Sequence, residues 1–255
     1  MDQPNQVLLE GLERSIRRFG PPAICYTIPT FHNPTGTSLS EEKRGALVEL
    51  SRRHGFRIIE DDPYSQLRFS GSPEPSLLSL DPERVIHLTS LSKTIAPGLR
   101  CGAVVLPEDL IDSTVRIVTG MYIAPGQLAQ ATAALIVGSP AYEQGLTRAV
   151  DELRRRRDVV LSGLGEIGWE CDPPAGGYFA WPYTGDVDTT RLSRAAQRVG
   201  VIVVPGNSFY LDHGGRHRLR LTWAALNTTE LAEALNRLSA AVTSVRRRSQ
   251  APEKE

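Results

Sequence analysis

The chain has 255 residues, of which 40% are hydrophobic, so it is long enough for one large domain or two modest ones. Its 29 Lys and Arg residues balance 29 Asp and Glu residues, so no overall charge attracts nucleic acid or an anionic membrane. Three separated cysteines and the lack of a long apolar run predict a cytoplasmic protein without a disulfide framework or membrane span. We therefore expect small-molecule ligands, with no nucleic-acid or membrane partner.

Helices and strands alternate in the first part of the chain. Apolar residues three or four positions apart predict a helix over residues 7–19, and a capping box at Ser38 and Glu41 predicts another over about 41–53. The residues expected on the apolar faces of these helices are Val7, Leu8, Leu12, Ile16, Phe19, Ala46, Leu47 and Leu50. Short β-branched runs predict strands over residues 23–28, 56–60, 84–89 and 101–106. This order is typical of an α/β fold with a mostly parallel sheet.

From Pro107 onward the pattern is first helical and then mixed. Helices are predicted over residues 108–121, 127–137, 141–165, 189–199 and 229–244. Short strands are predicted over residues 169–171, 176–181, 201–204 and 219–223. The run Arg154–Arg157 is bordered by acidic residues, which favours a solvated helix face over a nucleic-acid site. We expect a partial large domain over residues 1–140, a small α+β domain over 141–247 and a tail over 248–255.

Three polar side chains of different chemistry follow predicted strands. Asn33 lies in a turn fixed by proline and glycine, Asp61 follows the second strand, and Lys93 follows the third. Open α/β sheets bind their ligands at the carboxyl ends of the strands. We therefore expect a ligand site at this edge of the sheet.

Lys93 lies in a loop that is suited to an anionic ligand. Ser90 and Ser92 precede it, and a proline and a glycine turn the chain so that Arg100 returns toward the same place. These groups supply donors for a phosphate beside an amine that can form an imine. An ammonium held at a strand end without a ligand or counter-charge costs free energy, which favours a functional role for Lys93 over a structural one.

Four motifs resemble those of the fold type I, pyridoxal-phosphate-dependent aminotransferases of class I and II. They are Asn33-Pro34-Thr35-Gly36, Asp61-Asp62-Pro63-Tyr64, Ser90-Leu91-Ser92-Lys93 with Arg100, and Arg220-Leu221-Thr222-Trp223. The likeness covers nearly the whole chain and is greatest toward the branch of 2-aminoadipate and broad-specificity aminotransferases. It implies pyridoxal phosphate as cofactor and an incomplete form of the large domain that binds it, followed by a smaller α+β domain. It also implies transfer of an amino group between an amino acid and a 2-oxo acid.

The resemblance also implies a role for each site residue. The implied catalytic residues are Lys93, which holds the cofactor and moves a proton, Asp61, which faces the protonated ring nitrogen, and Tyr64. The implied cofactor contacts are Asn33, Asp61, Tyr64, Ser90, Ser92, Lys93 and Arg100. Arg220 is the implied ligand of the substrate carboxylate, although Arg218 would share its face in a strand. The five histidines lack metal-ligand spacing, so we expect no metal.

Family members are longer at the N-terminus, where they carry a phosphate-binding loop and an aromatic residue that stacks on the cofactor. The resemblance therefore implies a truncated form with impaired activity, and a homodimer if the missing part is supplied. Three alternatives stay open. The chain is the cofactor-binding effector domain of an aminotransferase-like transcription regulator, another pyridoxal-phosphate enzyme such as a lyase or racemase, or an inert remnant.

Overall fold

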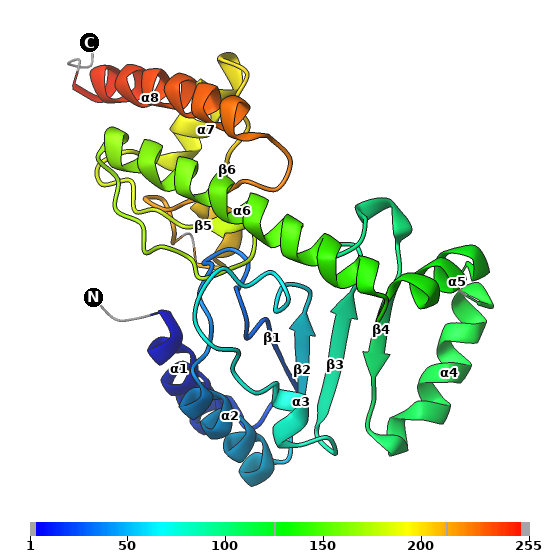
Figure 1. Cartoon of the computed structure of the whole chain (residues 1–255). Helices are drawn as coiled ribbons and strands as arrows, with labels where there is room; N and C mark the ends of the chain where they lie inside the picture. Colours follow the sequence, from blue (N-terminus) through cyan, green and yellow to red (C-terminus); the bar gives the residue numbers. More distant parts are fainter. Residues whose placement is uncertain (1–3, 125, 213, 251–255) are drawn as a thin grey trace. The chain divides into compact units, whose positions relative to one another are not determined.

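The computed structural model describes residues 4–124, 126–212 and 214–250, with only the backbone for 4–8 and 248–250 (Figure 1). It divides into two compact units. The first runs up to His32 and from Thr37 to Ala149, and the second contains Asn33–Gly36 and the residues from Val150 onward. The boundary between Ala149 and Val150 lies inside helix α6 (Pro140–Ile167).

The first unit contains a four-stranded sheet of order β1-β2-β3-β4. Its strands are β1 (Ile24–Thr27), β2 (Arg57–Asp62), β3 (Val85–Ser90) and β4 (Gly102–Val105). The first three run parallel, and β4 is antiparallel to β3. The predicted α/β fold with a mostly parallel sheet is therefore confirmed. Strand β2 continues to Asp62, so Asp61 lies within the strand and not in a turn after it.

Three helices cover one face of this sheet, which we call the covered face. They are α1 (Pro4–Phe19), α2 (Glu41–His54) and the short α3 (Leu77–Leu80). Their apolar residues form one core with the strands, made of Ile16, Leu47, Val48, Leu50, Phe56, Ile58, Leu77 and Val85. Register places Cys25, Ile58 and Val85 side by side, so alternate residues of each strand point into this core.

The ends of the helices explain several differences from the sequence-based expectations. Ser40, and not Ser38, caps α2 by accepting a hydrogen bond from the backbone N–H of Lys43. Gly55 ends the helix with φ 79°, a left-handed conformation that favours glycine. Two residues expected on apolar helix faces are exposed, Ala46 and Phe19, the latter at the very end of α1. The side chains of Val7 and Leu8 lie outside the described residues.

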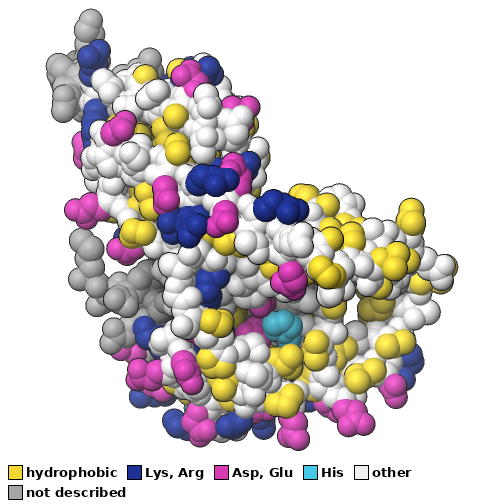
Figure 2. All heavy atoms as spheres, in the orientation of Figure 1, with side chains coloured by type: hydrophobic (Ala, Val, Ile, Leu, Met, Phe, Trp, Pro, Cys, Tyr) yellow, Lys and Arg dark blue, Asp and Glu magenta, His cyan; other side chains and the backbone are white. Residues whose placement is uncertain are grey.

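The opposite face of the sheet, which we call the open face, is far less covered. Ile24 is 50% exposed, Tyr26 58% and Val104 52%, although all three lie in strands. Helices α4 (Glu108–Tyr122) and α5 (Gln127–Ile136) follow β4, and none of the fully described residues of α4 is buried. Figure 2 shows hydrophobic side chains gathered over the part of the first unit that contains β4, α4 and α5. In this unit, burial therefore concentrates on one face.

The second unit contains a small antiparallel sheet of order β5-β7-β6. Its strands are β5 (Phe179–Ala180), β6 (Val204–Pro205) and β7 (Leu219–Thr222), with helices α7 (Thr189–Arg198) and α8 (Thr228–Gln250) and the 3-10 turn η2 (Gly206–Phe209). The strand expected at 169–171 is reduced to a single bridge between Glu170 and Tyr183. Helix α8 continues to Gln250, within the segment expected to be a tail, and residues 251–255 lie outside the described residues. Among the described helices, none has both the length and the apolar character needed to cross a membrane.

Candidate active site

Lys93 lies in a tight turn directly after β3. The backbone N–H of Ile95 donates to Leu91 O at 2.9 Å, and that of Leu91 donates to Cys101 O at 3.0 Å, which ties the turn to the start of β4. Lys93 is exposed, so the expected cost of holding its charge away from solvent does not arise. Its neighbour Thr94 has a buried Oγ1 atom without a hydrogen-bond partner among the described residues. A buried hydroxyl without a partner, in the turn that carries Lys93, is consistent with a ligand site.

Ser90, Ser92 and Arg100 form one hydrogen-bonded group beside this turn. The Ser92 N–H donates to Ser90 Oγ, and Arg100 Nη1 donates to Ser92 Oγ, both at 3.4 Å. The 3-10 turn η1 (Pro97–Leu99) and the left-handed conformation of Arg100, with φ 49°, bring the arginine back to the serines. The return of Arg100 predicted from the proline and glycine is confirmed. Two hydroxyls and a guanidinium in one place can bind a doubly charged anion.

Asp61 lies on the open face, next to β3. It pairs in register with Leu88, so it shares this face with Ser90 two residues further along β3. Tyr26 of β1 donates a hydrogen bond from its Oη to Asp61 Oδ2 at 2.5 Å. Tyr64, two residues beyond β2, is buried. The end of the sheet therefore presents a carboxylate held by a phenol.

Tyr26 is a residue that the sequence analysis missed as part of the site. Partial burial, the hydrogen bond to Asp61 and the electrostatic influence of Asp61 and Tyr64 raise the pKa of Tyr26 to about 12. The alternation of strand residues could have revealed it, since Tyr26 pairs with Ile59, which points to the same face as Asp61. Strand register, however, is not visible from one sequence.

Asn33 and Arg220 contact each other within the second unit. Arg220 Nη1 donates to Asn33 Oδ1 at 2.8 Å, across 187 positions of sequence. The Arg220 guanidinium also lies over the rings of Phe179, at 4.8 Å, and Phe209, at 5.0 Å. Arg218 has different partners, because it donates to Trp181 O and lies over the ring of Tyr183. The guanidinium of Arg220 is therefore oriented by an amide and two aromatic rings.

The turn that follows Asn33 requires its glycine. Gly36 has φ 70°, and a Cβ atom there would approach Phe179 O to 2.6 Å. At the base of this loop in the first unit, the His32 N–H donates to Thr37 O at 2.8 Å. The sequence Asn33–Gly36 therefore fixes a backbone shape that a larger residue at position 36 would disturb.

A buried charged network lies on the covered face of the four-stranded sheet. Glu60 accepts hydrogen bonds from the backbone N–H groups of Leu77 and Leu78 and from His87 Nδ1, and Arg44 lies 3.7 Å away. Burial alone raises the pKa of Glu60, but its hydrogen bonds bring the pKa below the usual value, and the bond to Glu60 raises the pKa of His87. His87 therefore stabilises a buried carboxylate.

No group of residues suited to a metal ion occurs in the described part of the chain.

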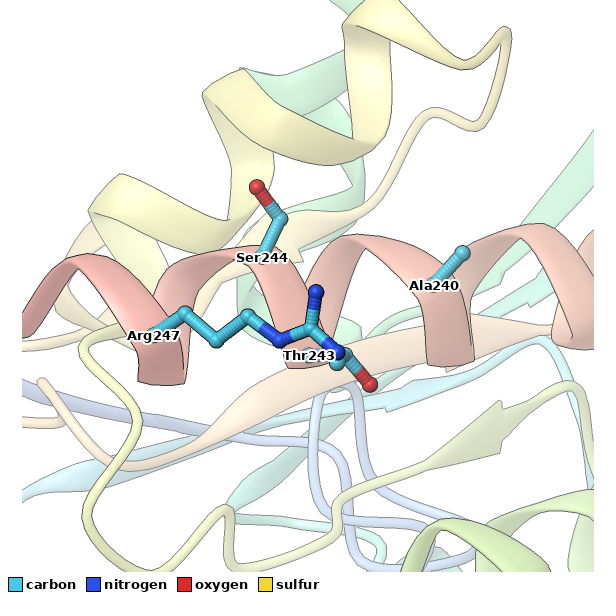
Figure 3. Close-up of a pocket in the computed structure, with 4 residues that line it drawn as sticks. All are labelled: Ala240, Thr243, Ser244 and Arg247. Atoms are coloured by element: carbon cyan, nitrogen blue, oxygen red, sulfur yellow. The ribbon is translucent and has the colours of Figure 1, made fainter.

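A shallow hollow on the second unit is lined by Ala240, Thr243, Ser244 and Arg247 (Figure 3). All four residues come from one helix, α8, and the Arg247 side chain lies along its surface. The hollow contains none of the residues that the sequence singles out, so we do not assign the chemistry to it.

Comparison with known proteins identifies one family. Residues 2–238 match the profile of the family described as aminotransferase class I and II. The aromatic-amino-acid aminotransferase 1 of Thermococcus litoralis is 31% identical over 221 residues, which are 85% of this chain and 53% of that protein. The uncharacterized HTH-type transcriptional regulator YisV of Bacillus subtilis is 33% identical over 228 residues, which are 87% of this chain and 46% of that protein.

A solved structure agrees with this result. The crystal structure of Pyrococcus horikoshii kynurenine aminotransferase superposes with a TM-score of 0.87 and 30% identity, covering 95% of this chain and 61% of that one. The fold expected from the resemblance is therefore confirmed. The chain spans about half the length of the curated relatives it matches, 55% and 53% for two of them.

Proposed function

Because the chain belongs to the class I and II aminotransferases, we propose that it carries the cofactor site and catalytic lysine of an enzyme that transfers an amino group between an amino acid and a 2-oxo acid. Pyridoxal phosphate is the cofactor of this family, and two related structures contain its pyridoxyl or amine form. One observation carries the proposal. Lys93 and Asp61 lie at the carboxyl ends of the adjacent parallel strands β3 and β2.

The residues at this end of the sheet fit pyridoxal phosphate. The exposed Lys93 amine suits its aldehyde, and the Asp61 carboxylate suits a protonated ring nitrogen. The Ser90, Ser92 and Arg100 group suits its phosphate, and the orphaned Thr94 hydroxyl offers one more polar contact.

Each residue has a defined task in the proposed reaction. Lys93 Nζ would take the proton from the substrate α-carbon and deliver it to the former aldehyde carbon of the cofactor. Asp61 supplies the counter-charge that keeps the ring nitrogen protonated, so that the bound cofactor can accept electrons from the α-carbon. Tyr64 would donate a hydrogen bond to the phenolic oxygen of the ring, and the resemblance gives Asn33 the same role. Arg220, oriented by Asn33, Phe179 and Phe209, binds the substrate carboxylate with two parallel hydrogen bonds.

The substrate class follows from the relatives only as a proposal. Similar proteins are named for kynurenine, α-aminoadipate and aromatic amino acids. We include these amino acids, with glutamate, as the first panel of amino donors. In a transamination each donor is converted into its 2-oxo acid.

A single half-reaction tests the proposal. The purified chain is mixed with pyridoxal phosphate and each amino acid, and the visible absorbance and the 2-oxo acid formed are measured. We expect only slow conversion by the wild-type chain, in line with the impaired activity that the resemblance implies, and none by Lys93→Arg, which keeps the positive charge but lacks a nucleophilic amine. Lys43→Arg is the matched control and should behave as wild type. Equal conversion by Lys93→Arg would refute the role of Lys93.

The regulator alternative is supported by the similarity to two HTH-type transcriptional regulators of Bacillus subtilis, YisV and YdfD. The matched family is described as aminotransferase class I and II, and the related solved structures are named as aminotransferases, so we favour transamination over regulation. The same experiment separates the two. A regulator domain would bind pyridoxal phosphate and release no 2-oxo acid.

A homodimer and a cytoplasmic location complete the proposal. The dimer is supported by helix α5, which contains no charged residue and exposes Leu128 to 83% and Leu135 to 82%. We expect sedimentation velocity to show dissociation in Leu128→Lys and none in Leu211→Lys, a matched change at a fully exposed leucine of the second unit. A wild-type chain that sediments as a monomer would contradict the dimer.

A further inference from the structure

The hydrogen bond between Tyr26 and Asp61 is the feature of the open face that the proposed roles leave unexplained. Tyr26 Oη lies 2.5 Å from Asp61 Oδ2, and the two residues come from neighbouring strands 35 positions apart in sequence. Tyr26 is 58% exposed and does not belong to the apolar core. The hydroxyl of Tyr26 therefore interacts with the Asp61 carboxylate and does not contribute to the packing of the sheet.

The sheet geometry explains why a tyrosine can reach this carboxylate. Tyr26 pairs with Ile59, so Tyr26 lies on the same face as Asp61 and two positions before it along the register. Side chains in such diagonal positions meet only when one of them is long or aromatic. A phenol at position 26 spans that gap, whereas phenylalanine would offer no donor.

The electrostatics fix the direction of the hydrogen bond. Because partial burial and the nearby Asp61 and Tyr64 raise the pKa of Tyr26 to about 12, the phenol stays protonated at any physiological pH. It can then only donate toward Asp61, whose ionised form accepts. One carboxylate oxygen is held by Tyr26, and Oδ1 is the other oxygen available for a cationic partner.

We propose that Tyr26 is a positioning residue that orients the ionised carboxylate of Asp61 toward the pyridine nitrogen of pyridoxal phosphate. This inference rests on the proposed function. In this proposal Tyr26 acts through its hydrogen bond to Asp61 and has no chemical step of its own. Its effect reaches the cofactor through Asp61, because a carboxylate that loses its donor is less well oriented toward the ring cation.

The test is a pH titration of the full chain loaded with pyridoxal 5′-phosphate labelled with ¹⁵N at its ring nitrogen. The nitrogen chemical shift reports ring protonation directly and does not depend on turnover. We expect the ring nitrogen of the Tyr26→Phe variant to lose its proton at a pH about one unit lower than in wild type. Tyr183→Phe, a matched loss of a phenol in the second unit, should titrate as wild type.

A double-mutant cycle shows whether Tyr26 acts through Asp61. In an Asp61→Asn background, which removes the carboxylate charge, Tyr26→Phe should produce no further shift. If Tyr26→Phe shifts the titration of the ring nitrogen by the same amount in this background, Tyr26 does not act through Asp61. If wild type holds a protonated ring and Tyr26→Phe titrates identically, this inference alone fails. If wild type shows no bound cofactor signal, the proposed function fails, and the inference with it.

Discussion

The two faces of the four-stranded sheet are built from alternate residues of the same strands, yet they differ in almost every respect. On the covered face Ile58 and Val85 are fully buried, whereas on the open face Ile24 and Val104 are about half exposed, at 50% and 52%. The covered face holds the apolar core against α1, α2 and α3. The open face holds Asp61 and Tyr26. Alternate residues of each strand therefore have different roles: those on the covered face stabilise the fold, and those on the open face carry the proposed chemistry.

Two consecutive acids make this separation clear. Glu60 points to the covered face, is 1% exposed and contacts four partners. Asp61 points to the open face and accepts a hydrogen bond from the phenol of Tyr26. A buried carboxylate with several donors is expected to hold its surroundings in place. A partly exposed carboxylate at a strand end remains available to a ligand. The following changes test this contrast.

The largest effect is expected for Glu60→Gln. This change removes the charge opposite Arg44 and His87 and cannot satisfy all the donors, so we expect a loss of about 3 to 5 kcal/mol in the free energy of unfolding. The control is Asp109→Asn, which breaks the exposed ion pair with Arg57 at 2.6 Å. It should cost less than about 1 kcal/mol, although its pair is shorter. Urea unfolding measures both, and equal losses would contradict the contrast.

A matched pair of isoleucines tests the apolar part of the comparison. Ile58→Ala removes a fully buried side chain of β2 and should cost about 2 to 5 kcal/mol. Ile24→Ala, in the neighbouring strand β1 but half exposed, should cost less than about 1 kcal/mol. Thermal and urea unfolding of the two variants give the difference. A similar cost at both positions would mean that the open face is covered in solution.

The stability of the covered face should depend on pH through His87. Its hydrogen bond to Glu60 raises the pKa of His87 above the usual 6.5, so the folded chain holds this proton more tightly than the unfolded chain. The resulting stabilisation is present below pH 6.5 and is lost as the pH rises through the raised pKa. We expect a loss on the order of 1 kcal/mol, measured by urea unfolding between about pH 6 and pH 9.

The control for this pH dependence is His87→Gln, which should be less stable at low pH and should lack the part of the loss that comes from His87. The difference between the two curves cancels the titration of the other histidines. Parallel curves would show that His87 does not contribute through its proton.

The smallest effect is expected for Val104→Thr on the open face. At 52% exposure the new hydroxyl can be hydrated, so the free energy of unfolding should change by less than about 0.5 kcal/mol. Val85→Thr, at 0% exposure, buries the same hydroxyl and should cost about 1 to 3 kcal/mol. A large loss for Val104→Thr would contradict the exposure of β4.

The sequence predicts the strands and helices of the first unit well because their apolar spacing and turn residues are strong local signals. It also predicts the return of Arg100 to Ser92, since a proline and a glycine determine the turn. The contact of Tyr26 with Asp61 depends on the register between β1 and β2, which is a property of the folded sheet. The exposure of Lys93 and Phe19 depends on what packs around them, which local patterns do not contain.

The most direct measurement of the central claim is chemical labelling by pyridoxal phosphate. The sequence has three lysines, Lys43, Lys93 and Lys254, so the two others are internal controls. The chain is incubated with the cofactor, reduced with borohydride and mapped by mass spectrometry of its peptides. We predict that the cofactor mass is found on the peptide of Lys93 and on neither of the others. Equal labelling of all three lysines, or labelling that spares Lys93, would contradict the account.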